Sequence, residues 1–364
     1  MSFLLPFLLA FGINIILTPI TIFWAKKYGF VDDPKRHKHP ATIHKRTIPR
    51  AGGLSIFLAF VVTALLVLPM TQKLLGIILG GLILIVVGII DDRYDLKSSW
   101  KLLVQLLAAL IVVGSGIGIS FITNPLALLG FGAWGTADVI RLDQYQIFFN
   151  FFGQHSIIIL ADLFALFWIV WVANMVNFSS GVDGQMPGVV LITLVVIFAA
   201  SLRFIGTDQQ QLIVTKLSLI GAGATFGFLI YNFYPAKIFP GDSGSYFLGF
   251  LVAVLAILSG AKVGTAILVM AIPLIDGVFT VVRRLAEGKS PFVGDRKHLH
   301  HRLLELGWGQ RRVALFYYLV CAILGAAALT LHSVEKLFAG VFVAIIVLGG
   351  LLWLNITLQV RGQK

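Results

Sequence analysis

Charged side chains are scarce in this sequence: they make up 12% of its 364 residues, against 58% that are hydrophobic. Soluble domains carry about twice that charged fraction, so most of this chain is expected to lie in lipid. Apolar stretches long enough to span the hydrocarbon core recur throughout. They cover residues 3–24, 52–70, 74–90, 102–122, 156–176, 185–204, 212–231, 246–260, 263–282, 313–332 and 338–358. The pattern predicts an all-α polytopic membrane protein with about eleven transmembrane helices.

Cysteine is nearly absent as well. The only one, Cys321, lies in an apolar stretch and has no partner for a disulfide within the chain. The first apolar stretch has neither a basic segment before it nor a small-residue cleavage site after it. Because a signal peptide carries both features, we interpret this stretch as a retained first span.

Acidic residues number only 16 against 28 Lys and Arg, and the basic residues are unevenly placed. Of those 28, 22 fall in every second connecting segment, namely 25–51, 91–101, 177–184, 232–245, 283–312 and 359–364. Cytosolic segments carry such an excess, so we expect a multi-pass plasma-membrane protein with its N-terminus outside and its C-terminus in the cytosol. Basic loops beside anionic lipid headgroups account for the net charge of +12 without a nucleic-acid partner.

Polar motifs concentrate on the predicted cytosolic side. We therefore expect one integral-membrane domain, residues 1–364, whose active face consists of the loops 25–51, 91–101, 177–184, 232–245 and 283–312. That face is expected to bear the active site, because the connecting segments on the opposite side contain few residues of the types that catalyse reactions or bind ligands.

The third apolar stretch ends in two aspartates, Asp91 and Asp92, within "GIIDDRYDLKSSWK". Carboxylates at the hydrocarbon boundary are costly unless they are paired or bound to a cation. Mg²⁺, or Mn²⁺ in its place, fits this position, and Asn177 and Asp242 supply oxygen ligands from two other loops. The alternative is that the two aspartates only end a helix and pair with the nearby Arg93 or Lys97.

Two glycine-rich stretches lie in neighbouring loops. The glycines of "PGDSGS" around Asp242 and of "GVDG" around Asp183 let backbone N–H groups approach a phosphate closely. Each stretch alone is also compatible with a purely structural loop.

The last large loop is rich in histidine and basic residues. His298, His300 and His301 lie with Arg296, Lys297 and Arg302 in "GDRKHLHHRL". This group is either a clamp on a diphosphate or a solvated patch facing the lipid headgroups. Zinc is disfavoured because no cysteine accompanies the histidines.

Five motifs, in this order and on one face, resemble the polyprenyl-phosphate N-acetylhexosamine-1-phosphate transferase family, in particular its WecA/TagO-like branch. They are "DDPKRHKHPATIHKRTIPRAGGLSIF", "GIIDDRYDLKSSWKLLVQ", "NMVNFSSGVDG", "FPGDSGSYFLG" and "SPFVGDRKHLHHRL". The resemblance implies transfer of a sugar 1-phosphate from a UDP-linked N-acetylhexosamine, N-acetylglucosamine first, to polyprenyl phosphate. It also implies Mg²⁺ as cofactor, UMP as product and a role in initiating a lipid-linked cell-envelope glycan. "TIPRAGG" and "DRKHLHHRL" favour this branch over the MraY-like, phospho-MurNAc-pentapeptide branch.

The resemblance also implies roles for individual residues. Asp91, Asp92 and Asp242 are the implied catalytic residues, and the same three with Asn177 are the implied metal ligands. The implied substrate-binding residues are Lys101, Asn174, Asp183, His298, His300, His301, Arg302 and His44. Ser180 departs from the pattern, because many relatives carry Asp there.

The residues themselves leave the aspartate chemistry open. A phosphate monoester is mostly a dianion at neutral pH, so direct attack by the acceptor needs no base. Asp91 and Asp92 then bind metal and position the acceptor; the alternatives are proton removal or a covalent aspartyl-phosphate. The oligomeric state is open too, with a homodimer as one expectation.

Two other protein classes remain as rivals. "RYD" at 93–95 and "PGD" at 240–242 faintly resemble the motifs of intramembrane aspartyl proteases, although Phe239 breaks the glycine pattern. A transporter of anionic solutes is the second rival, and it predicts ionisable groups near the middle of the membrane.

Overall fold

The computed structural model describes residues 3–34, 43–44, 46–124, 139–150, 154–208, 210–259, 262–290 and 296–362. The helices are α1 Leu4–Tyr28, α2 Gly52–Val67, α3 Gln72–Tyr94, α4 Ser98–Gly114, α6 Ile159–Phe178, α7 Gln185–Leu202, α8 Gln210–Asn232, α9 Gly241–Leu258, α10 Lys262–Val269, α11 Ala271–Ala286, α12 Leu299–Glu305, α13 Gln310–Thr330 and α14 Ser333–Gly362. The strands are β1 Val31–Asp32, β2 Ile48–Pro49, β3 Phe121–Thr123, β4 Val139–Arg141, β5 Gln146–Asn150 and β6 Gln154–Ile158. They pair as three two-stranded antiparallel sheets, β1 with β2, β3 with β4 and β5 with β6.

The described residues confirm a helical polytopic membrane protein. Eight helices are long and apolar enough to span a membrane, and a ninth span is formed if α10 and α11 count as one bent pair. The shorter apolar helices α2 and α4 coincide with the other two predicted spans. Each of the eleven predicted stretches therefore falls on a helix or on the bent pair, while the membrane crossing of α2 and α4 stays a prediction.

Two predicted spans differ from the structure in shape. The stretch 102–122 ends as a helix at Gly114, because the chain turns at Gly116 (φ 84°) and then enters β3. The stretch 263–282 is broken between α10 and α11, whose axes differ by 82°. Pro273 explains the break, since its ring would clash with the carbonyl of Val269 in a continuous helix.

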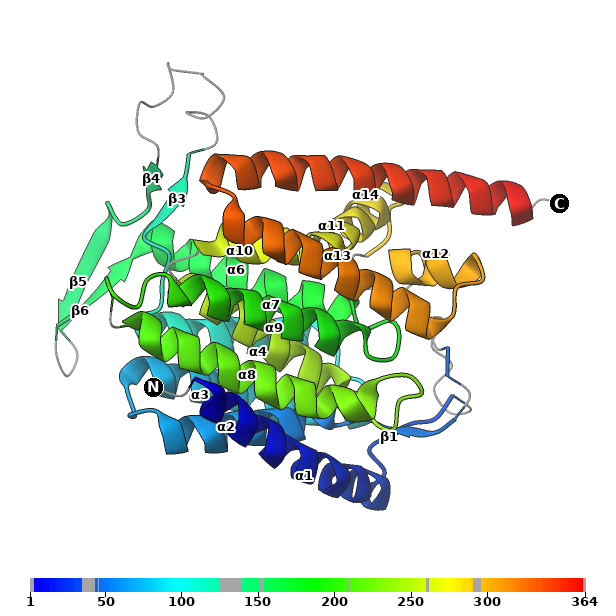
Figure 1. The fold of residues 1–364 in the computed structure, drawn as a ribbon, viewed down its shortest axis with the longest axis horizontal. Coiled ribbons are helices and arrows are strands. Elements are labelled where there is room, and N and C mark those ends of the chain that lie inside the picture. The colour runs from blue at the N-terminus through cyan, green and yellow to red at the C-terminus, as the bar shows by residue number, and fades with distance from the viewer. Residues whose placement is uncertain are drawn as a thin grey trace.

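The helices lie roughly side by side in one bundle (Figure 1). The β3–β4 and β5–β6 hairpins lie at one end, where α1 begins, and α14 finishes at the other end, near α12 (Figure 1). The two termini thus lie at opposite ends, as an odd number of crossings requires. Which end faces the cytosol stays a prediction. The hairpins were not foreseen in the sequence.

Helix α9 is the most deeply packed element, and glycines let its neighbours approach it closely. Nearly all of α9 is buried against α2, α3 and α6. A Cβ at Gly53 would overlap the backbone of Gly244, and one at Gly88 would overlap Ser243. A Cβ at Gly249 would lie 2.7 Å from Ala173 Cα. Close helix contact through small residues is typical of membrane bundles, and here it fixes the helix that begins with Asp242.

Candidate active site

One cavity of about 690 Å³ opens at the end of the bundle opposite the β3–β6 hairpins. Described residues from all five loops predicted to form the active face line it. They include His44 from the first loop, Lys101 from the second, Asp183 from the third, Asp242 from the fourth and His298 from the fifth. Segments far apart in sequence therefore meet at one place, as the motif order predicted.

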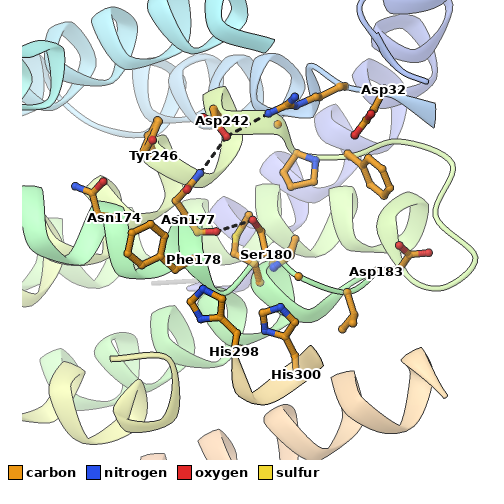
Figure 2. Close-up of a pocket in the computed structure, with 18 of the residues that line it drawn as sticks. Asp32, Asn174, Asn177, Phe178, Ser180, Asp183, Asp242, Tyr246, His298 and His300 are labelled. Carbon is orange, nitrogen blue, oxygen red and sulfur yellow. Dashed lines mark hydrogen bonds and ion pairs between the residues drawn. The ribbon is translucent and has the colours of Figure 1, made fainter. Parts of the chain in front are cut away.

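Asp242 lies in the first turn of α9 with its carboxylate at the cavity (Figure 2). Lys101 Nζ donates to its Oδ2 at 2.9 Å, and Asn177 Nδ2 donates to its Oδ1 at 3.1 Å. Arg50 Nη2 lies 3.4 Å from the same Oδ1. We call Asp242, Asn177, Lys101 and Arg50 the acidic wall. The name refers to the Asp242 carboxylate, which the other three side chains surround.

Asp91 and Asp92 lie behind this wall. Asp91, 1% exposed, contacts Lys101 Nζ at 2.7 Å and accepts the backbone N–H of Leu96 at 2.7 Å. Asp92, 6% exposed, pairs with Arg50 Nε at 3.0 Å. The described lining of the large cavity includes neither aspartate.

Arg93, one of the two partners suggested for the aspartate pair, contacts a different group. Arg93 donates instead to the backbone carbonyl of Tyr28 at 2.7 Å. The cations that do pair with Asp91 and Asp92, Lys101 and Arg50, come from other elements. Partial burial alone would lower the pKa of the Arg50 guanidinium, but the charges of Asp92 and Asp242 outweigh it and raise that pKa. Arg50 therefore stays charged.

Histidines form the other side of the cavity (Figure 2). We call His298, His300 and His301 the histidine wall. The rings of His298 and His300 stack at 5.5 Å, and those of His300 and His301 lie 4.3 Å apart. His298 Nδ1 lies 2.9 Å from Asp276 Oδ2, while the other Asp276 oxygen accepts the N–H of Leu299. Asp276 thus fixes the ring and the start of α12 together.

Burial of His300, with His301 and His298 beside it, lowers the pKa of His300 well below its usual value. Its ring packs on Gly181, where a Cβ would overlap Nε2. His300 is therefore neutral at pH 7, so any positive charge on this wall must come from other groups.

The remaining predicted residues are distributed unequally. Asn174 lines the cavity and exchanges hydrogen bonds with Gln105, its Nδ2 donating to Gln105 Oε1 at 2.5 Å. Asp183 Oδ2 accepts the N–H of Ala236 at 2.9 Å, and burial raises the pKa of this carboxyl. His44 also lines the cavity, with its Nε2 3.8 Å from Asp32 Oδ1.

Arg302 lies outside the described lining of the cavity, as Asp91 and Asp92 do. Its Nη1 pairs with Glu305 one turn later on α12 at 2.8 Å. Ser180, which stands where many relatives carry Asp, lines the cavity and donates its Oγ to the carbonyl of Asn177 at 2.6 Å.

Four residues of the site were not predicted: Arg50, Gln105, Asp276 and Arg284. Arg284 lies 6.0 Å from the centre of the Phe178 ring, which also lines the cavity. Asp276 carried a usable signal, because a carboxylate inside an apolar stretch indicates a buried partner. Arg50 lay within a quoted motif, but its partners could not be read from local sequence.

The donor set at the acidic wall fits Mg²⁺. Among the described residues, no three His, Cys, Asp or Glu side chains form a group that would hold a metal by themselves. Mg²⁺ takes only one or two protein carboxylates and completes its shell with water and phosphate oxygens. Asp242 offers carboxylate oxygens at the cavity, and the Asn177 amide, whose Nδ2 donates to Asp242 Oδ1, also carries an oxygen that could bind a metal; the Lys101 ammonium lies beside the same carboxylate.

Comparison with known proteins agrees with this geometry. Residues 74–260 match the family described as Glycosyl transferase family 4. A "Probable undecaprenyl-phosphate N-acetylglucosaminyl 1-phosphate transferase" of Bacillus subtilis is 30% identical over 96% of this chain and 89% of its own length. A "Decaprenyl-phosphate N-acetylglucosaminephosphotransferase" of Mycobacterium tuberculosis is 32% identical over 89% of this chain and 82% of its own. A "Phospho-N-acetylmuramoyl-pentapeptide-transferase" of Bacillus subtilis is 28% identical over 88% and 96%.

The chain is a polytopic membrane protein with a polar cavity at one end of its helical bundle. It belongs to Glycosyl transferase family 4.

Proposed function

We propose that this protein transfers N-acetylglucosamine 1-phosphate from its UDP-sugar to undecaprenyl phosphate and releases UMP, at the cytoplasmic face of the plasma membrane. The observation that carries the proposal is the pair of walls around one cavity at the end of a membrane-spanning bundle. A lipid phosphate at the boundary and a soluble diphosphate can meet there. The names of the relatives supply the sugar and the lipid class.

Two anionic substrates repel each other unless cations lie between them. Mg²⁺, held by Asp242 and Asn177, would place positive charge on the donor diphosphate and stabilise the UMP leaving group. Lys101 adds a second charge, since its ammonium lines the cavity between Asp91 and Asp242. A charged donor fixed in advance stabilises charge that develops on the transferred phosphoryl group.

Direct attack is the step that the site supports. An oxygen of the acceptor phosphate dianion forms a bond to the phosphorus that bears the sugar, and the bond from that phosphorus to the UMP oxygen breaks. No proton has to move, because the acceptor dianion and UMP are both stable at neutral pH. Asp91 is engaged with Lys101 and Leu96 N, so it positions the ammonium and has no oxygen directed at the large cavity.

The histidine wall then serves to bind the donor. His298 is fixed through Nδ1 by Asp276, which leaves Nε2 as the ring nitrogen for a ligand. Asp183 and His44 line the same cavity, and the nucleoside part of the donor would extend toward them. This assignment gives the histidine wall a hydrogen-bonding role.

The experiment is UMP release by the purified protein with UDP-N-acetylglucosamine and undecaprenyl phosphate, in Mg²⁺, in EDTA, and in EDTA followed by excess Mg²⁺. We expect release only when the lipid phosphate and the metal are both present. UDP-MurNAc-pentapeptide, run in parallel, tests the alternative donor. Folded protein that releases no UMP from any UDP-sugar, yet carries anions into proteoliposomes, would contradict the proposal and favour a transporter.

The predicted homodimer is tested with the same preparation. Light scattering of the purified protein in detergent gives the mass of the protein component, which a dimer would double relative to the 39.7 kDa chain.

A further inference from the structure

Arg50 is held in place by its own backbone. Its N–H donates to the carbonyl of Phe30 at 2.9 Å, and the residue pairs in parallel with Phe239, just before α9. On either side, Phe239 N donates to Pro49 O at 2.8 Å and Gly53 N donates to Pro240 O at 2.9 Å. The end of the first loop is therefore attached, backbone to backbone, to the start of α9.

The Arg50 side chain reaches carboxylates from two helices. Its Nε lies 3.0 Å from Asp92 Oδ1, on α3, and its Nη2 lies 3.4 Å from Asp242 Oδ1, on α9. One planar guanidinium thus joins the two carboxylates through different nitrogens, which a lysine ammonium on a flexible stem cannot reproduce.

The Asp92 carboxylate is fully engaged with the start of α9. Its Oδ1 accepts the Asp242 N–H at 2.7 Å, and its Oδ2 accepts the Ser243 hydroxyl at 2.8 Å. Its side chain has no exposed surface. Gly241 has a positive φ of 69°, and a Cβ there would overlap this carboxylate, so the turn is shaped around Asp92.

Asp92 and Asp242 therefore occupy different situations although they are neighbours. Asp242 lines the cavity, whereas Asp92 is absent from the described lining and bonds to the backbone N–H of Asp242 itself. A carboxylate whose oxygens are already taken by N–H, O–H and guanidinium donors has little capacity left for a metal ion.

We propose that Arg50 and Asp92 are positioning residues that act as one unit: the pair fixes the first turn of α9, and thereby the direction of the Asp242 carboxylate, without contacting metal or substrate. This inference rests on the proposed function for its catalytic consequence. The pairing itself concerns the folded protein and can be measured without any substrate.

The first test is a double-mutant cycle in full-length protein. We expect Arg50→Gln and Asp92→Asn each to lower the kcat of UMP release about 100-fold, the loss that a misplacement of about 1 Å can cause, with little change in KM. The double variant is expected to lose about the same 100-fold, because residues that act as a unit are not additive. Losses that multiply would overturn the proposal.

Arg50→Lys gives a second reading that needs no change at Asp92. A lysine keeps the positive charge but lacks the planar guanidinium with its several nitrogens, so we expect Arg50→Lys to recover part of the kcat that Arg50→Gln loses. Equal activity of Arg50→Lys and wild type would show that only charge matters. Arg93→Gln is the matched control, since Arg93 bonds to Tyr28 O away from the cavity and its loss is expected to leave kcat unchanged.

Metal rescue separates positioning from ligation. Asp242→Cys and Asp92→Cys are assayed with Cd²⁺ in place of Mg²⁺, because a thiolate prefers the softer ion. We expect Cd²⁺ to restore activity to Asp242→Cys and not to Asp92→Cys. Rescue of Asp92→Cys would identify Asp92 as a ligand and refute the positioning role.

The four proteins of the cycle are also melted without substrate. Coupled losses of melting temperature are expected, because removing either partner leaves a buried charge unpaired. If the wild type releases no UMP, the proposed function fails. The melting temperatures of the four proteins still decide whether Arg50 and Asp92 form a unit. Independent losses in the melt would refute the pair.

Discussion

The two walls of the cavity are built on different principles. The acidic wall is centred on Asp242 of α9, whose first turn is fixed by backbone contacts with the first loop and by glycine contacts with α2 and α3. The histidine wall stands on the seven-residue helix α12, held chiefly through Asp276 and the contact of His300 with Gly181. The difference teaches that the Asp242 carboxylate and its cations are fixed through backbone contacts, whereas the stacked rings are held through side-chain contacts.

The largest effect is expected from the acidic wall. Asp242→Asn keeps the shape of the side chain but removes the charge that attracts the metal, so UMP release should fall on the order of 1,000-fold. The measurement is the rate of UMP release at saturating Mg²⁺. Asp143→Asn is the control, since that exposed pair with Arg141 lies near the hairpins. If Asp242→Asn kept most of its activity, the acidic wall would have to be reassigned.

A smaller loss is expected when the support of the histidine wall is removed. Asp276→Asn should reduce UMP release by up to about 100-fold, because His298 loses the partner that orients it. Thr280→Val tests the weaker 3.3 Å contact to the same Nδ1, and we expect it to stay close to wild type.

A methyl group at Gly181 should act more mildly on the same wall. Gly181→Ala places a Cβ where the His300 ring lies, so the ring must move; we expect a weaker donor interaction, seen as a higher KM for the UDP-sugar. Gly114→Ala, in the last turn of α4 with nothing within 4 Å, serves as the comparison. Identical kinetics for both variants would mean that His300 does not contact the donor.

The smallest effect is expected from pH. Because the pKa of His300 is lowered in the folded state, the unfolded chain binds the proton first as pH falls through about 6.5. The stability associated with the neutral ring is therefore present above that pH and is lost below it. Melting temperatures between pH 8 and 5 should fall less steeply for His300→Gln than for wild type. Parallel curves would exclude His300 as the cause.

Much of this arrangement could be predicted from the sequence, for physical reasons. Hydropathy placed every span on a helix or on the bent pair, because lipid tolerates few other structures. The alternation of Lys and Arg sorted the polar loops onto one side, and residues from all five loops line the cavity. Asp242, Asn177 and His298 were chosen by residue type and motif, and the structure brings them to the same place.

The remainder depended on packing between distant segments. Arg50 could not be joined to Asp92 from sequence, because their contact arises from the pairing of residues 49–53 with 239–240. The β3–β4 and β5–β6 hairpins were missed because the hydrophobic residues in their aromatic and polar sequence repeat neither with a helical period nor in clean alternation. Arg302 was selected with the histidines by proximity in sequence, yet it pairs with Glu305 and is absent from the described lining.

The close packing around Gly53, Gly88 and Gly241 has a consequence for inhibition of this protein. An inhibitor that binds the acidic wall would contact residues whose loss removes activity. The backbone that supports these residues is packed so closely at the glycines that a side chain could not be added there. Resistance substitutions should therefore be rare on that wall. They should collect around α12, where side chains can change without disturbing the first turn of α9.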